Sequence, residues 1–191
     1  FLIVLVGTLV SFGLSTRRLI SYLAIGKPDS RTDRPSERFR NVLVVAFGQS
    51  KLLREPLAGI MHFFIFWGFV ILLLAILESV GEGLSHTFSL AFLGPVYPPL
   101  LFLQDLLGLL VVGSVLLALI RRYVSTPARL EVSGHARLDA TIILCWMFSI
   151  MVSMFGQNAA SIAVGTAVSG DARFVSAMLA GAFAGLSAER V

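Results

Sequence analysis

The feature that most constrains this chain is a stretch without any charged residue that runs from Pro56 to Leu77. About 20 apolar residues is the length that an α-helix needs to cross the hydrocarbon core of a bilayer. The rest of the sequence has the same character, since 57% of its 191 residues are hydrophobic and only 14% are charged. One small soluble core cannot bury so much apolar surface. We therefore predict an all-α fold, a polytopic membrane helix bundle.

Four apolar stretches predict four spans, at about residues 1–25, 56–78, 98–122 and 138–165. A shorter apolar segment at 173–188 has its large side chains on one helical face, which is typical of a short outer-face or additional helix. Residues 28–55 form a basic loop with an apolar patch, and we expect an amphipathic helix there on the inner membrane surface. Together these segments predict one transmembrane domain over 1–191, which we expect to be a fragment of a longer chain.

The cations predict how the chain is oriented in the membrane. Of the 15 Lys and Arg residues, nine lie between Arg17 and Arg54 and four between Arg121 and Arg137. The positive-inside rule puts both basic loops on the cytoplasmic side and the N-terminus outside, in a multi-pass protein of the inner cell membrane. Attraction to anionic lipid headgroups then accounts for the net charge of +4, so no nucleic-acid partner is expected. The one cysteine, Cys145, excludes an iron–sulfur cluster held by this chain alone.

His62 has the most informative position of any polar residue, because it lies two turns into the second span. An ionisable side chain at this depth is costly and needs a partner inside the bundle. A neutral imidazole is also an axial ligand of b-type haem, and Gly59, Phe63, Phe66 and Trp67 supply the small residue and the aromatic walls that a porphyrin needs. A structural histidine bonded to a neighbouring hydroxyl explains the position as well. The residues alone leave both interpretations open.

A haem held by two histidines needs a second ligand, and the chain has two further histidines. His86 lies in the predicted outer loop, on the wrong side to pair with His62. His135 lies on the matching side but at the headgroup boundary, where a surface histidine is the simpler interpretation. We keep His135 as an alternative metal ligand. The simplest solution places the second ligand after Val191 or on another chain.

Three further polar residues are candidates for a quinone site or a proton path. Gln49 and Lys51 precede the second span at its inner end, where they could bind a quinone carbonyl or a partner, or instead cap the helix and contact headgroups. Asp105 lies a few residues into the third span from the outer side, where it could relay protons or be a hydrogen-bonded interfacial acid. The methionines of the fourth span, such as Met151, recur at helical spacing and predict core packing rather than cofactor ligation.

Two motifs, in their order along the chain, resemble a known family. Residues 47–54 (FGQSKLLR) are followed by residues 59–69 (GIMHFFIFWGF). This combination resembles the N-terminal membrane domain of heterodisulfide-reductase-related iron–sulfur proteins, in particular the electron-transfer flavoprotein:menaquinone oxidoreductases. Residues 103–108 (LQDLLG) and 137–140 (RLDA) fit the same pattern. The resemblance covers most of the chain and is weakest after about Gly156.

The resemblance implies a bundle similar to the gamma subunit of respiratory nitrate reductase, with His62 as a ligand of haem b. It also implies menaquinone as substrate, and electron exchange with 4Fe–4S clusters in a cytoplasmic iron–sulfur domain or subunit that receives electrons from an electron-transfer flavoprotein. The clusters, and the last histidine-bearing span of the family, would lie outside this sequence. On this basis we expect the membrane electron-transfer domain of a respiratory quinone oxidoreductase.

Two other functions are compatible with the sequence. A non-redox membrane anchor would only hold a cytoplasmic partner at the bilayer, so His62→Ala would leave quinone reduction intact. A small transporter component would need a polar path through the bilayer. The spans offer only Asp105, Gln157 and Asn158 for such a path.

Overall fold

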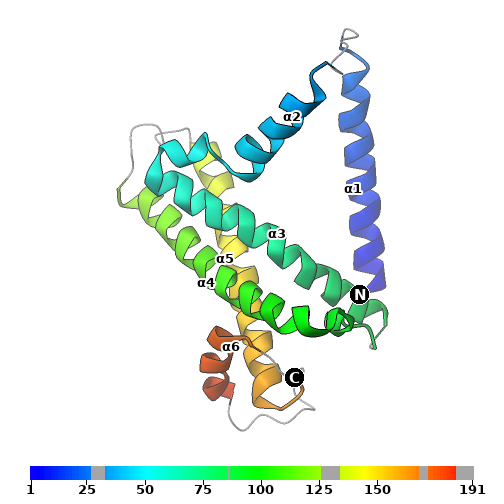
Figure 1. Ribbon diagram of the computed structural model, residues 1–191, viewed down its shortest axis with the longest axis vertical. Helices are drawn as coiled ribbons and strands as arrows, with labels where there is room; N and C mark the ends of the chain where they lie inside the picture. Colours follow the sequence, from blue (N-terminus) through cyan, green and yellow to red (C-terminus); the bar gives the residue numbers. More distant parts are fainter. Residues whose placement is uncertain (27–32, 86, 126–133, 168–171, 184–191) are drawn as a thin grey trace.

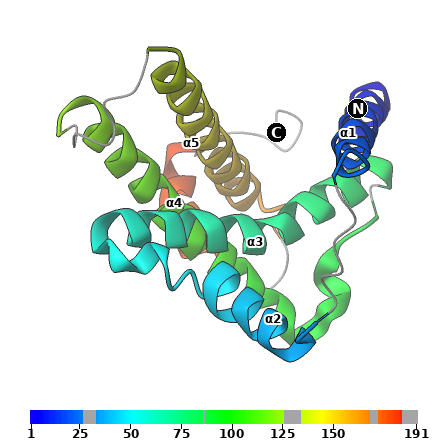
Figure 2. The same ribbon diagram turned by 90° about the horizontal axis from the view of Figure 1, so that it is seen from above.

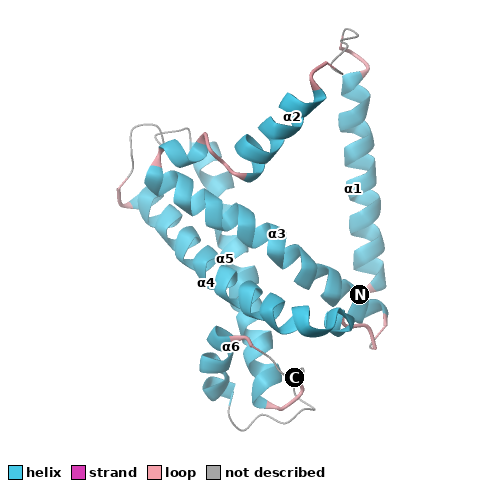
Figure 3. Ribbon diagram, in the orientation of Figure 1, coloured by secondary structure: helices cyan, strands magenta, loops and turns pink. Residues whose placement is uncertain are grey.

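The computed structural model describes residues 1–26, 33–85, 87–125, 134–167 and 172–183, and within them the chain is helical with connecting loops (Figure 3). Four helical stretches are long and apolar enough to cross a membrane. They are α1 (Leu2–Leu23), α3 (Pro56–Leu84), the stretch formed by η3 (Leu90–Val96) with α4 (Tyr97–Tyr123), and α5 (Gly134–Ala163). The prediction of an all-α fold with several apolar helices of membrane-spanning length is confirmed.

The core lies among α3, α4 and α5. Leu72 of α3, Val111 and Val115 of α4, and Met151 of α5 are buried together. Gly68 lets α3 and α4 approach closely, because a Cβ at this position would overlap the Val111 side chain. Figure 1 shows α3 and α4 side by side, with α5 crossing them. The burial of Met151 in this core confirms the packing role predicted for the methionines.

Helix α1 stands apart from this core. None of its residues is buried, and Figure 2 shows it to one side of the other long helices. Phe1, which directly precedes α1, has its ring next to Gly83 near the end of α3. A helix that is apolar and exposed on all sides is suited to contact with lipid or with a further helix.

The end of α3 and the extent of the segment at 173–188 differ from the predicted limits. Helix α3 continues past Glu78 to Leu84, although the sequence suggested a boundary at this charge. The segment predicted at 173–188 contains α6 (Phe174–Leu179) and the 3₁₀ turn η5 (Ala180–Phe183), and residues 184–188 lie outside the described residues. The described part is shorter than a membrane crossing requires.

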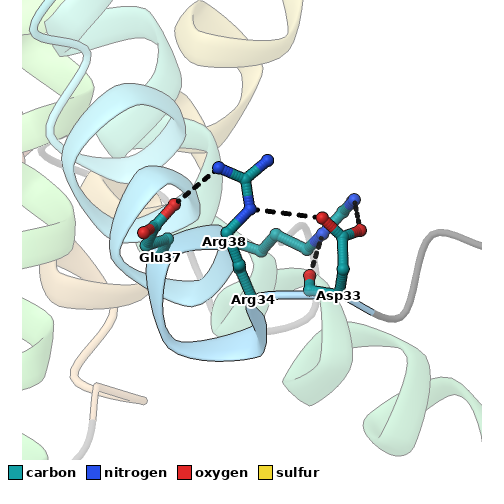
Figure 4. Close-up of polar contacts among 4 residues, drawn as sticks. All are labelled: Asp33, Arg34, Glu37 and Arg38. Carbon is teal, nitrogen blue, oxygen red and sulfur yellow. Dashed lines mark hydrogen bonds and ion pairs between the residues drawn. The ribbon is translucent and has the colours of Figure 1, made fainter.

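The basic segment before α3 is helical in three short pieces: α2 (Pro35–Asn41), the π-helical turn η1 (Val42–Phe47) and the 3₁₀ turn η2 (Leu52–Arg54). Ion pairs order the start of α2 (Figure 4). Arg38 donates to Asp33 at 2.7 Å, and Arg34 lies 3.2 Å from Asp33 and 3.5 Å from Glu37. The Arg38 guanidinium, helped by Arg34, lowers the pKa of the exposed Asp33 carboxyl from its ordinary value of 3.8.

Candidate functional site

The central contact of the candidate site joins His62 to Gln49. The Nδ1 atom of His62 lies 3.1 Å from Oε1 of Gln49. Because an amide oxygen only accepts, Nδ1 carries the proton and donates it, which leaves the lone pair on Nε2. Gln49 is 1% exposed, whereas His62 is exposed at the surface of the bundle. Within the described residues Nε2 of His62 has no hydrogen-bond partner.

Local backbone geometry brings Gln49 to this position. The π-helical turn η1 is followed by Gly48, whose amide donates to the Leu43 carbonyl at 2.8 Å. A Cβ at Gly48 would lie 2.8 Å from the Val44 carbonyl oxygen, so the close turn requires glycine. The next residue, Gln49, has a φ of 49°, in the left-handed region that few side chains adopt. With this backbone the Gln49 side-chain amide lies toward α3, within hydrogen-bond distance of His62.

Aromatic side chains lie beside this pair. Phe47, the last residue of η1, contacts Phe66 with ring centroids 6.2 Å apart and Trp67 at 6.3 Å. Phe63 lies 6.4 Å from Trp67, and Phe66 lies 5.8 Å from Trp67. The three aromatic residues predicted around His62 thus form one cluster, and Phe47 is a fourth member that the sequence analysis missed. This cluster holds η1 against α3.

Gly59 has a packing role that the sequence did not suggest. A Cβ at Gly59 would lie 2.8 Å from the Cα of Leu53 and would overlap the Leu52 carbonyl oxygen. The glycine therefore allows η2 to lie directly on the first turns of α3. The space that the sequence analysis assigned to a porphyrin at Gly59 is filled by the backbone of η2.

Lys51 lines a cavity of about 360 Å³ at the basic end of the bundle. The cavity lies where η2 and the start of α3 meet the end of α4 and Leu144 of α5. Its charged residues are Lys51, Glu55, Arg121 and Arg122, and its other lining residues are Leu52, Ala58, Gly59, Met61, Ala118 and Leu144. We call it the basic-end cavity.

The two other histidines do not join His62 in the described structure. His135 is exposed in the first turn of α5, and His86 lies outside the described residues. Among the described residues, no three His, Cys, Asp or Glu side chains gather as a metal site.

Asp105 lies toward the opposite end of the bundle and binds a segment far away in sequence. Its Oδ2 accepts from the backbone amides of Val175 at 2.5 Å and Ser176 at 3.3 Å, and its Oδ1 accepts from the Ser176 hydroxyl at 2.6 Å. Asp105 is 1% exposed. Of the two interpretations of Asp105, this geometry favours the hydrogen-bonded acid, which holds the start of α6 on α4.

Glu78 is a buried polar residue whose role the sequence analysis missed. Its Oε1 accepts from the Leu90 amide at 2.7 Å, the Tyr97 hydroxyl at 2.8 Å and the Ser89 hydroxyl at 3.0 Å. These bonds join the end of α3 to η3 and the first residue of α4. The signal was present in the sequence, because a glutamate that follows a long apolar run is soon followed by hydroxyl residues.

The three candidates for a quinone or proton path thus lie in different places. Gln49 is bonded to His62, Lys51 faces the basic-end cavity, and Asp105 is tied to α6 toward the other end. They do not converge on one site. Asn158, a candidate for a transport path, accepts a hydrogen bond from Arg173 at 2.6 Å.

Comparison with known proteins gives two relatives. The chain is 30% identical over 152 residues to the "Probable iron-sulfur-binding oxidoreductase FadF" of Bacillus subtilis, and 33% identical over 124 residues to the "EtfAB:quinone oxidoreductase" of Syntrophomonas wolfei. The matches cover 80% and 64% of this chain but 21% and 16% of the relatives, so the chain spans about a fifth of their length. No family model matches, and no solved structure shows significant similarity. The chain is therefore homologous, through a membrane domain, to a portion of larger oxidoreductases of the iron–sulfur and quinone type.

Proposed function

We propose that this chain is the membrane electron-transfer domain of a quinone oxidoreductase, with His62 as an axial ligand of a b-type haem. Electrons would come from an electron-transfer flavoprotein through 4Fe–4S clusters in another part of the protein or a partner, and would pass to menaquinone. The names of the two relatives support an iron–sulfur protein and a quinone. The haem, the menaquinone and the flavoprotein donor are our extension of that likeness.

The state of the His62 imidazole carries this proposal. A structural histidine in a membrane span should be buried and satisfied at both nitrogens, because unpaired polar atoms are costly in hydrocarbon. His62 instead lies exposed on an apolar helix, with Nδ1 bonded and Nε2 without a partner among the described residues. An exposed Nε2 atom that carries no proton and lies next to a cluster of aromatic rings fits the donor that haem iron requires.

Gln49 supports the proposed ligand in a specific way. Histidines that bind metals usually donate their other ring nitrogen to a nearby acceptor, which fixes both the tautomer and the ring orientation. The Gln49 Oε1 atom provides this acceptor, and its fixed backbone limits how far the imidazole can rotate. When bound, a b-type haem supplies one-electron transfer, and its reduction potential depends on the axial ligand and on the hydrogen bonds of that ligand.

The second axial ligand of the haem and the orientation of the chain in the membrane are proposed from the sequence. We place the second axial ligand outside this chain, with His135 as the alternative inside it. The basic end of the bundle, which holds Lys51 and Arg121, would face the cytoplasm by the positive-inside rule. That orientation puts His62 in the cytoplasmic half of the bilayer, on the side where the soluble iron–sulfur partner would dock.

The test replaces His62 in the full-length enzyme and restores the ligand from solution. We expect His62→Gly to lose the b-type band from the reduced-minus-oxidised absorption spectrum, because the iron loses a ligand. Added imidazole should restore that band, since it can occupy the space of the missing side chain. Ile60→Gly serves as the control, because it places the same glycine on an exposed position of the same helix.

Two results would contradict the proposal. One is a wild-type enzyme without a b-type band, which would leave the membrane-anchor function as the better explanation. The other is a band that persists unchanged in His62→Gly, which would show that another residue binds the iron. Loss of the band in Ile60→Gly as well would point to a folding defect, and the imidazole rescue then decides whether the ligand itself matters.

A further inference from the structure

The basic-end cavity combines charge and apolar surface in a way that suits an amphiphilic ligand. Lys51, Arg121 and Arg122 place three cations on its lining, against the single carboxylate of Glu55. Apolar residues of η2, α3, α4 and α5 form the rest of the wall. A volume of about 360 Å³ is within the range of small-molecule sites. The excess of cations selects for an anion.

The position of the cavity along the spans sets the depth of its ligand. Lys51 directly precedes η2, Glu55 directly precedes α3, and Arg121 and Arg122 lie in the last turn of α4. Figure 1 shows the start of α3 and the end of α4 at the same end of the bundle. Charges that flank apolar spans lie at the level of the lipid headgroups. The apolar wall then extends from that level toward the hydrocarbon.

We propose that the basic-end cavity binds the phosphate headgroup of an anionic phospholipid. Basic pockets between membrane helices are suited to such headgroups, and arginine offers several donors to phosphate oxygens at once. The glycerol and the first methylenes of the lipid then contact Ala58, Met61 and Ala118. This site goes beyond the proposed electron transfer and does not depend on a haem at His62.

Lipid binding is expected to stabilise the packing of the segments that line the cavity. The η2 turn lies on Gly59, and this contact brings Lys51 beside the end of α4. The lining carries three cations and one carboxylate, so its net charge is positive and an anion placed there is stabilised. A bound phosphate would balance this charge and so stabilise the junction of η2, α3, α4 and α5.

The experiment uses the full-length protein, purified and stripped of lipid, with native mass spectrometry as the readout. We expect the wild type to retain phosphatidylglycerol in preference to phosphatidylcholine. A cation near a headgroup contributes enough to change affinity about fivefold, so Lys51→Gln with Arg121→Gln should weaken phosphatidylglycerol binding about 25-fold. The matched control is Arg17→Gln with Arg18→Gln, which removes two exposed cations of α1 that do not line the cavity.

Further variants keep the result decisive. Arg121→Lys retains the charge and should retain the preference for phosphatidylglycerol, which separates loss of charge from loss of fold. Equal loss in the α1 control, or equal retention of phosphatidylcholine by the wild type, would overturn the proposal. Displacement of the lipid by millimolar inorganic phosphate would identify a free anion as the ligand and would overturn the assignment to a lipid.

Discussion

The contact between Asp105 and α6 allows a prediction that depends on no cofactor. In Asp105→Asn one carboxyl oxygen becomes an NH₂ group, while the other stays an acceptor. If the remaining oxygen keeps the Ser176 hydroxyl at Oδ1, the new NH₂ faces the amides of Val175 and Ser176, which then lose their acceptor. A hydrogen bond to a charged group contributes about 1.5–3 kcal/mol, and a buried donor left without a partner costs a similar amount.

We expect this change to weaken the docking of α6 by about 3 kcal/mol, which corresponds to a rise on the order of a hundredfold in the open population. Hydrogen exchange at the amides of Val175 and Ser176 should accelerate by that factor, while exchange in the core of α3 and α4 stays unchanged. Asp139→Asn, at an exposed position of α5, provides the same chemical change without the contact. If both variants exchange alike at these amides, the carboxyl does not hold α6 and our account of Asp105 is wrong.

Two further predictions concern the other carboxyl groups. Glu78→Ala leaves three donors without their shared acceptor and should lower the free energy of unfolding by roughly 3 kcal/mol. Glu82→Ala, at an exposed position, should change that free energy little. Equal losses for the two variants in a steric-trapping unfolding assay would contradict this prediction. The lowered pKa of Asp33 means that its contribution to the order of α2 is complete above pH 3.8 and is lost as the pH falls through the folded-state pKa. An NMR titration should show the Asp33 pKa rise in Arg38→Gln, and an unchanged value would refute the ion pair as its cause.

The long helices could be predicted from the sequence because lipid imposes a simple rule on length and charge. Each predicted span overlaps one of the long apolar helices, and Met151 lies in the core as its spacing indicated. Charged residues predict the ends of helices less reliably. The sequence predicts a boundary at Glu78, yet α3 passes through it, because three donors from the segment Ser89–Tyr97 satisfy its carboxylate. A local pattern cannot reveal donors that arrive from the next helix.

The contacts of the candidate site were beyond prediction for the same reason. His62 and its aromatic neighbours were identified from helical spacing, but the acceptor for its imidazole is thirteen residues upstream, beyond a π-helical turn. Asp105 meets its partners seventy residues further along the chain. Such pairs depend on how whole segments fold back on one another. Periodicity shows which face of a helix is apolar, but not which distant loop covers it.

Position 49 shows how narrow the choice of residue can become when backbone and side chain are constrained together. The left-handed φ favours glycine or asparagine, while the contact with His62 needs an acceptor that reaches α3. Glycine meets the first demand and not the second, and leucine meets neither. If position 49 is randomised and the variants are selected for native folding and for the His62 contact, very few amino acids should be accepted. Many more should be accepted at the neighbouring exposed position 50, where the sequence has serine.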